Sequence, residues 1–297
     1  MQPLYLRSAE YNIVEHCNLR CAGCDHASPL LPKTFLSLVN FEKDLLALKH
    51  TARIGTFKLL GGEPTLHPQI IQFILKVKSL DFTETVCVIT NGTVLHKMDD
   101  RFWQEVDLLQ VTIYPNVVVK MTVEEMQAKA DSFGVRLEIE DKRYFRHTIM
   151  DEKILDAELV KDIFKACELP TTYACHTVRH GRFYKCSPAA FTAERLLLRG
   201  ELYDDSGDYI QLEDKEDMSV ALEAYLNSDA PLPSCAYCLG TCGTSFESYQ
   251  ISQQILKANR SVIAHNSDTR IEDLLDRAHL QKRLQLLNMT NYRHGEV

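Results

Sequence analysis

The 297-residue chain lacks the features that direct a protein to a membrane or onto a nucleic acid. It has no basic N-terminal leader followed by an apolar segment, and no uncharged apolar run of membrane-spanning length. Its formal net charge is -8, and its lysines and arginines are scattered rather than gathered in a stripe. These absences predict a cytoplasmic protein with a small-molecule partner and with neither nucleic acid nor membrane as a partner.

Cysteine is the residue that the chain has in unusual number, with ten in total. Thiols stay reduced in the cytoplasm, and disulfide-dense scaffolds are usually much shorter, so we interpret most of them as metal ligands. Cys87 lies in an apolar run and Cys167 follows a helical apolar stripe, so these two are interpreted as small buried hydrophobic residues. The other eight form two groups: Cys17, Cys21 and Cys24, and Cys175, Cys186, Cys235, Cys238 and Cys242.

Between residues 11 and 139, short β-rich runs alternate with segments of helical periodicity, which predicts an α/β fold with a parallel sheet. Asn40 is the expected N-cap of the first helix, and Thr122 with Glu125 forms a capping box for a later one. No clear signal marks a sixth strand. The five expected strands are 11–15, 56–60, 85–89, 108–114 and 135–140.

The alternation of strand and helix ends near residue 168. Residues 172–188 predict a hairpin that turns at His180 and Gly181. The tail after residue 246 predicts helices that cap the fold or, as the less favoured alternative, form a dimer surface. The predicted domains are therefore 1–168, 169–245 and 246–297.

The segment HCNLRCAGCDH, residues 16–26, places Cys17, Cys21 and Cys24 directly after the first expected strand. Three thiolates leave one iron of a [4Fe–4S] cluster open to a substrate or cofactor, just as catalytic metal sites keep an open position. The alternative is a zinc site that takes His16 or His26 as its fourth ligand.

Two further motifs follow expected strands, GGEP at residues 61–64 and ITNG at residues 89–92. Together with the Cys-x3-Cys-x2-Cys loop they resemble the radical SAM superfamily. The resemblance implies a partial (β/α)6 TIM-like barrel and reductive cleavage of S-adenosylmethionine to methionine and a 5'-deoxyadenosyl radical, which removes a hydrogen atom from carbon. Gly23 departs from the family, which usually has a hydrophobic residue before the third cysteine. The implied cofactor-binding residues are Gly61, Gly62, Glu63, Pro64, Thr90 and Asn91.

Two of these motifs have a simple chemical rationale. Gly61 and Gly62 would let the main chain approach a ligand closely, and Glu63 would offer a negative charge to the methionyl ammonium group. Thr90 and Asn91 could reach ribose or carboxylate groups.

The second cysteine group resembles the shortened auxiliary-cluster module called a twitch domain, an irregular α+β unit. The resemblance implies that Cys175, Cys186, Cys235 and Cys238 close a second [4Fe–4S] cluster. A four-cysteine zinc ribbon is the alternative that the spacing permits.

Cys242 is left over by this assignment. The chain resembles the radical SAM epimerases and dehydrogenases that act on aminoglycosides and sugars. The leading hypothesis is hydrogen abstraction at a carbinol carbon of a sugar, aminocyclitol or glycoconjugate, followed by epimerisation with Cys242 as the catalytic hydrogen donor. The alternative enzymes are a dehydrogenase that oxidises a secondary alcohol to a ketone and a peptide maturase. The latter is disfavoured because only sixteen residues precede Cys17.

A non-enzymatic iron–sulfur electron carrier is the hypothesis from another class, and it is disfavoured because a carrier has no use for GGEP and ITNG. The enzyme hypothesis implies a reduced flavodoxin or ferredoxin as the electron donor and a carbohydrate-like substrate. Candidate substrate contacts are His26, Tyr114, Arg179 and His180.

Overall fold

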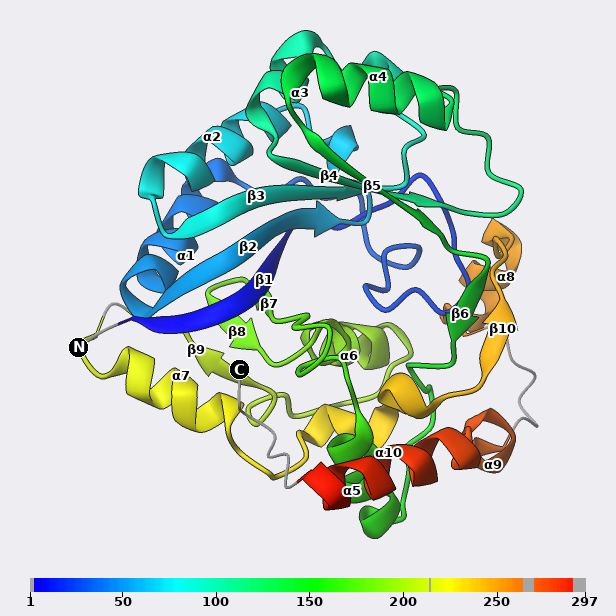
Figure 1. The fold of residues 1–297 in the computed structure, drawn as a ribbon. Helices are drawn as coiled ribbons and strands as arrows, with labels where there is room; N and C mark the ends of the chain where they lie inside the picture. Colours follow the sequence, from blue (N-terminus) through cyan, green and yellow to red (C-terminus); the bar gives the residue numbers. More distant parts are fainter. Residues whose placement is uncertain (1–2, 214, 264–269, 291–297) are drawn as a thin grey trace.

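The computed structural model describes residues 3–213, 215–263 and 270–290 (Figure 1). Its main sheet has eight strands, which are β1 (Leu4–Val14), β2 (Ala52–Gly61), β3 (Thr83–Thr90), β4 (Leu108–Ile113), β5 (Arg136–Asp141), β7 (Thr177–Arg179), β8 (Arg182–Tyr184) and β9 (Tyr209–Gln211). Their order is β5-β4-β3-β2-β1-β7-β8-β9. The neighbours from β5 to β7 run parallel, and β8 and β9 run antiparallel to their neighbours.

Four helices alternate with the parallel strands along the chain and lie on the outer face of the sheet (Figure 1). They are α1 (Leu38–Thr51), α2 (Ile70–Leu80), α3 (Asp100–Glu105) and α4 (Val123–Phe133). This arrangement confirms the predicted α/β fold with a parallel sheet. The sheet is open, because no strand pairing in the described residues joins β5 to β9. It is therefore a partial barrel.

The main core lies between the helices and the sheet. Phe41 of α1 packs edge-on against Tyr11 of β1, with ring centroids 4.7 Å apart. The Tyr11 hydroxyl donates a 2.7 Å hydrogen bond to Asp44, and the Gly181 N–H donates to the same carboxylate at 3.0 Å. Asp44 thus joins the first helix, the first strand and the β7–β8 turn, which satisfies a buried carboxylate with two donors.

The capping expectations have mixed outcomes. The predicted box of Thr122 and Glu125 at the start of α4 is confirmed. The predicted N-cap at Asn40 is wrong, because α1 begins at Leu38 and the Ser37 side chain accepts from the Val39 N–H. Ser37 is itself a favoured N-cap residue three positions earlier, and the helix begins there.

The predicted hairpin is confirmed, since Arg179 pairs with Arg182 across a turn at His180 and Gly181 that has positive φ at both residues. The sixth parallel strand, which had no signal of its own, is one arm of this hairpin: β7 pairs with β1 on the side opposite β2. The main sheet therefore continues past residue 168, and the three domain boundaries stay predictions.

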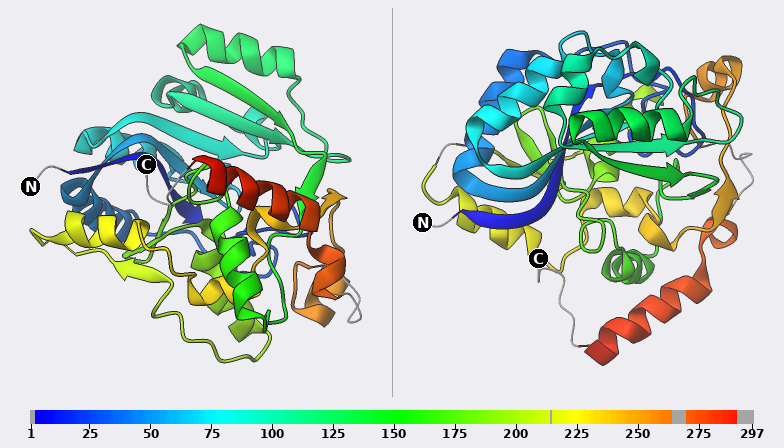
Figure 2. Two further views of the ribbon diagram at one scale, coloured as in Figure 1. Left: turned by 60° about the horizontal axis from the view of Figure 1, so that its bottom comes forward. Right: turned by 45° about the horizontal axis from the view of Figure 1, so that its top comes forward.

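Several of the remaining elements lie beside the main sheet, whereas α7 packs against α1 and the main core. The short strands β6 (Tyr144–Arg146) and β10 (Ser245–Glu247) pair with each other. The helix α10 lies against α5 and shares a second hydrophobic core with it, so the described part of the tail covers the fold (Figure 2). The other helices of the described chain are α5 (Ala157–Ala166), α6 (Ser187–Leu198), α7 (Met218–Leu226), α8 (Gln253–Asn259), α9 (Ile271–Leu274) and α10 (Arg277–Thr290), with the 3-10 turns η1 (Pro64–Leu66), η2 (Leu95–Lys97), η3 (Pro233–Tyr237) and η4 (Gly240–Cys242).

Among the helices in residues 3–213, 215–263 and 270–290, none combines the length and the apolar character that crossing a bilayer requires.

The carboxyl end of β2 lies directly against the loop that follows β1. The Gly62 N–H donates to the Val14 carbonyl at 2.8 Å. A Cβ atom at Gly62 would lie 2.0 Å from the His16 carbonyl oxygen and 2.6 Å from the Cys17 nitrogen, far inside contact distance. The glycine is thus required by the close approach of two main-chain segments, and not only by a ligand as we expected.

We expect Gly62→Ala to lower the free energy of unfolding by about 3 kcal/mol or more, because the main chain at His16 leaves no space for the added methyl group. Gly134→Ala is the control, since Gly134 has a φ of +71° but no atom within 4 Å of an added Cβ. It should cost about 1–2 kcal/mol from backbone strain alone. Urea unfolding measures both values, and equal losses would contradict the packing explanation.

Candidate functional site

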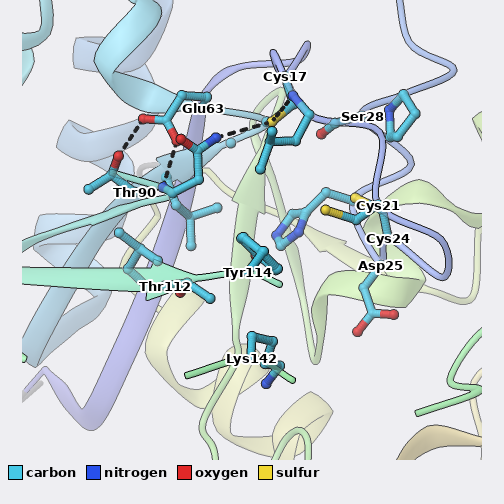
Figure 3. Close-up of a pocket in the computed structure, with 18 of the residues that line it drawn as sticks. Cys17, Cys21, Cys24, Asp25, Ser28, Glu63, Thr90, Thr112, Tyr114 and Lys142 are labelled. Atoms are coloured by element: carbon cyan, nitrogen blue, oxygen red, sulfur yellow. Dashed lines mark hydrogen bonds between the residues drawn. The ribbon is translucent and has the colours of Figure 1, made fainter. Parts of the chain in front are cut away.

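One cavity of about 230 Å³ lies at the carboxyl ends of the parallel strands (Figure 3). Because those ends meet at one edge of a sheet, side chains that are far apart in sequence converge there. The loop after β1 contributes the first three cysteines, β2 contributes Gly61 to Glu63, and β3 contributes Thr90 and Asn91. The structure thus brings together every predicted residue of the first site except Pro64, which begins η1 and does not line the cavity.

The Glu63 carboxylate is the centre of a buried hydrogen-bond network. It accepts hydrogen bonds from the Thr90 hydroxyl at 2.6 Å, from the Asn91 N–H at 2.8 Å and from both the N–H and the hydroxyl of Thr65. Burial raises the pKa of Glu63, although these donors act in the opposite direction. The Glu63 carboxylate therefore joins the ends of β2 and β3. The Thr90 hydroxyl is occupied by its hydrogen bond to this carboxylate.

The Asn91 side chain connects this network to the cysteine loop. Its Nδ2 donates to Asn18 Oδ1 at 2.8 Å and lies 3.6 Å from Cys17 Sγ. The Asn18 amide in turn donates to the Thr93 hydroxyl at 2.7 Å. Asn91 consequently positions the loop from the strand side.

The distant segment 246–262 holds the opposite side of the loop. The Ala22 N–H donates to the Tyr249 carbonyl at 3.0 Å, and the Gln250 side chain donates to Cys21 Sγ at 3.2 Å. Nothing in the sequence pattern marked Gln250. Gly23 has a φ of +66°, and its missing Cβ would lie 2.9 Å from the Phe246 ring. The expected hydrophobic residue before Cys24 is therefore replaced in space by Phe246.

The three thiols are buried among groups that disfavour their ionisation. Burial raises the pKa of all three, to about 12 for Cys24, and the negative charge of Glu63 raises that of Cys17 further. Such thiols ionise when a positively charged metal centre coordinates them. Three convergent sulfurs without a fourth match an open [4Fe–4S] cluster, and Cys17, Cys21 and Cys24 are the residues that would hold it.

The rest of the cavity is polar, and several of its residues were missed by the sequence analysis. His26 and Tyr114, two expected substrate contacts, do line it. The newly found lining residues include Asp25, Glu140 and Lys142, and burial raises the pKa of Asp25 to about 6. Asp25 adjoins Cys24 in sequence, and this adjacency could have identified it as a site residue. Lys142 follows β5 and reaches the cavity only because the chain folds, so no local sequence signal marks it.

His26 has a carboxylate neighbour inside the molecule. Its Nε2 lies 3.8 Å from Glu10 Oε1, and its ring meets Phe191 edge-on at 5.3 Å. Burial would raise the pKa of Glu10, but His26 and the hydrogen bond from Thr177 outweigh burial and lower it. His26 therefore lines the cavity with the buried Glu10 carboxylate behind it.

The other two expected substrate contacts lie outside the cavity. Arg179 is buried and forms ion pairs with Glu15 at 3.1 Å and Glu194 at 2.7 Å. His180 occupies the hairpin turn and has a side chain that is 57% exposed. Their positions favour structural roles.

The second cysteine group differs from the expected set. A small apolar cavity is lined by the thiol residues Cys167, Cys186, Cys235 and Cys238. Cys175 is not among its lining residues, and its thiol lies 3.8 Å from the Tyr173 carbonyl instead. Cys167, which we interpreted as a small core residue, thus takes the place expected for Cys175.

The surroundings of Cys167 and Cys238 suit thiolate ligands. The Gly240 N–H donates to Cys238 Sγ at 3.2 Å, and a Cβ on Gly240 would lie 2.6 Å from Cys167 Sγ. Burial raises the pKa of Cys235 to about 12, and Lys185 offers it a nearby positive charge. The apolar stripe before Cys167 did not distinguish this position from a core position, because a helix end that faces a core and one that faces a cavity have the same periodicity.

Cys242 lies in the second hydrophobic core, with none of its surface exposed. It packs with Leu239, Leu275 and Leu280 and does not line the cavity of the first three cysteines. A hydrogen donor has to reach its substrate, so the catalytic assignment of Cys242 stays a prediction that its position does not support.

The zinc alternatives require ligands gathered around one ion at about 2.3 Å from each sulfur. In the described parts of the chain, no three His, Cys, Asp or Glu side chains are close enough to hold a single metal ion. Neither thiol set therefore forms a preassembled site for a single zinc ion in the described residues.

Comparison with known proteins gives partial matches. Residues 11–117 match the family model described as the Radical SAM superfamily. GTP 3',8-cyclase of Rippkaea orientalis is 31% identical over 109 residues, which cover 35% of this chain and 32% of that protein. Human Molybdenum cofactor biosynthesis protein 1 is 32% identical over 99 residues, 33% of this chain and 15% of that protein. The chain thus spans about a third or less of these curated relatives.

Solved structures give a weaker likeness. The crystal structure of BtrN in complex with AdoMet and 2-DOIA has a TM-score of 0.39 at 15% identity, covering 63% of this chain and 75% of that one. Streptococcus suis SuiB bound to S-adenosylmethionine has a TM-score of 0.37 at 15% identity, covering 46% of this chain and 33% of that one. Scores this low support no statement about this chain. Residues 11–117 are therefore similar to the Radical SAM superfamily, and the three-cysteine loop at the strand ends lies within the matched range.

Proposed function

We propose that this chain is a radical SAM enzyme that oxidises a carbinol of a polar, carbohydrate-like small molecule to a ketone. The observation that supports the proposal of a radical SAM enzyme is the cavity at the strand ends, where three thiols lie next to the Glu63 network. When bound, the open cluster supplies the electron that cleaves S-adenosylmethionine, and the resulting carbon radical removes the carbinol hydrogen. The cytoplasmic location is part of this proposal.

The chain's own residues bind and orient the reactants. Gly61, Gly62 and Glu63 form the wall where the methionyl group would lie, with the Glu63 charge facing an ammonium. Tyr114 and Phe145 stack with centroids 5.9 Å apart and offer a flat apolar wall. These features suit a ligand that combines a charged end with an aromatic ring.

The charges of the cavity favour a hydroxylated or amine-bearing substrate. Among its lining residues in the described chain, Lys142 is the only lysine or arginine, whereas Asp25, Glu63 and Glu140 are acidic. A triphosphate would need more cationic partners. The GTP 3',8-cyclase activity named for the relatives is therefore not the activity that we propose here.

Oxidation is favoured over epimerisation by the positions of Cys242 and of the four cysteines that line the small apolar cavity. Removal of a hydrogen atom leaves a carbon radical, which becomes a ketone by losing one electron and the hydroxyl proton. A second cluster held by Cys167, Cys186, Cys235 and Cys238 would accept that electron. Epimerisation needs a hydrogen donor at the substrate, and Cys242 is enclosed in a core instead.

The anaerobically reconstituted, reduced protein is expected to form 5'-deoxyadenosine from S-adenosylmethionine. A Cys17→Ala, Cys21→Ala, Cys24→Ala variant should lose this activity to background, because it cannot hold the open cluster. Cys87→Ala is the matched control, since that thiol is buried in β3, 1% exposed, and lines no cavity with the three cysteines. The amount of 5'-deoxyadenosine formed by each protein is measured by chromatography. Formation of 5'-deoxyadenosine by the triple variant would contradict the proposal.

Iron content distinguishes the two sets of ligands for the second cluster. We expect about eight irons in the wild type and about four in Cys167→Ala, whereas Cys175→Ala should keep about eight. Mössbauer spectra and sulfide analysis of the three proteins test this. Loss of about four irons in Cys175→Ala but not in Cys167→Ala would restore the set expected from the sequence.

The third test concerns Cys242. Once a substrate is found by screening amino sugars and aminocyclitols, Cys242→Ala should form ketone within about threefold of the wild-type rate, since oxidation needs no thiol donor. The reaction is run in deuterated solvent and followed by mass spectrometry. Solvent deuterium at the carbinol carbon of the wild-type product, absent with Cys242→Ala, would instead establish epimerisation.

A further inference from the structure

A second hollow lies on the outer side of the cysteine loop, away from the polar cavity. It has a volume of about 730 Å³ and is lined by residues of the loop, of the end of α6 and of α8. Its apolar lining includes Leu197 and Leu198, which are 64% and 37% exposed. Adjoining exposed leucines are costly to leave in water, and such patches commonly mark interaction sites.

Four positively charged side chains surround these leucines: Arg20, Lys33, Lys257 and Arg260. All four are exposed, and the described chain places no carboxylate within ion-pairing distance of any of them. No acidic residue is among the described residues that line the groove. This concentration of positive charge contrasts with the formal net charge of -8 for the whole chain.

Two of the four basic side chains at the rim are held in place by hydrogen bonds to main-chain carbonyls. Arg20 Nε donates to the Ile251 carbonyl at 3.1 Å, and Arg260 Nη1 donates to the Leu198 carbonyl at 3.4 Å. Lys33 and Lys257 make no hydrogen bond of this kind within the described residues, and they extend from the loop and from α8. The groove is therefore a basic rim around an apolar floor.

The groove and the polar cavity share part of their lining. Cys17, Ser28 and Pro29 belong to both, so a single loop separates them. A partner that covers the groove would lie next to the first thiol of the proposed open cluster.

We propose that this groove, which we call the basic groove, docks an acidic one-electron carrier protein of the flavodoxin or ferredoxin type. The charge complementarity argues for an acidic partner, and the shared Cys17 argues for one that delivers an electron. One electron passes from the reduced carrier to the cluster for each S-adenosylmethionine cleaved, so the carrier is oxidised by one electron and no bond changes in the docking step. The electron-transfer part rests on the proposed function, but docking itself does not.

The basic rim is tested by the double variant Lys33→Glu, Lys257→Glu, whose side chains are exposed and take no part in the polar cavity. The matched control is Lys43→Glu, Lys153→Glu, which changes the net charge equally at exposed positions outside the groove. Each protein is mixed anaerobically with reduced flavodoxin or with reduced methyl viologen, a small cation, and cluster reduction is followed by stopped-flow absorbance. Binding of oxidised flavodoxin is measured by calorimetry.

With flavodoxin at low salt, the groove variant should be reduced about tenfold or more slowly, and the difference should shrink as salt screens the charges. Its affinity for oxidised flavodoxin should fall in parallel. The control variant should match the wild type, and methyl viologen should reduce all three proteins at equal rates. Equal loss in both variants, or no loss in either, would overturn the docking assignment.

Failure of docking and failure of the proposed function are separable. If methyl viologen reduces the cluster but no 5'-deoxyadenosine forms, the enzymatic proposal is wrong. The kinetics and binding of flavodoxin then still test whether the basic groove is its docking site. If the groove variant has normal flavodoxin kinetics but a raised KM for S-adenosylmethionine or substrate, the groove is an entry route for small molecules and the docking proposal is wrong.

Discussion

The buried carboxylate of Glu63 is the contact on which the rest of the site depends. It joins the ends of β2 and β3 through Thr90 and Asn91, and Asn91 extends the connection to the cysteine loop. A buried carboxylate without donors would be strongly unfavourable, so the network specifies one arrangement of these strand ends. The close approach of Gly62 to His16 then leaves the loop no room to move in that direction.

The loop is held equally firmly from the far end of the chain. Tyr249 and Gln250 contact Ala22 and Cys21, and Phe246 fills the space beside Gly23. Residues more than two hundred positions apart thus build one cysteine site. A loop fixed on both sides is preorganised, which lowers the entropic cost of holding a cluster in a position from which one iron stays accessible.

The two faces of this loop have opposite charge. Asp25, Glu63 and Glu140 make the inner cavity acidic, whereas Lys33 and Lys257 contribute to a basic outer groove. This separation suits an enzyme that binds a neutral or cationic small molecule on one side and an acidic protein on the other. The second thiol set lies beside η3 and the end of α5.

The sequence by itself determined the α/β fold, the hairpin and the first cysteine loop, because periodicity, turn residues and the spacing within a short segment are local properties. Only the tertiary structure decided which side chains meet in each cavity and core. It placed Cys167, and not Cys175, in the cavity lined by Cys186, Cys235 and Cys238, enclosed Cys242 in a core, and brought Lys142 into the polar cavity. It also made an arm of the hairpin the sixth parallel strand. Which thiols meet depends on how helix ends and loops pack, and that packing is not encoded in the distance between cysteines along the chain.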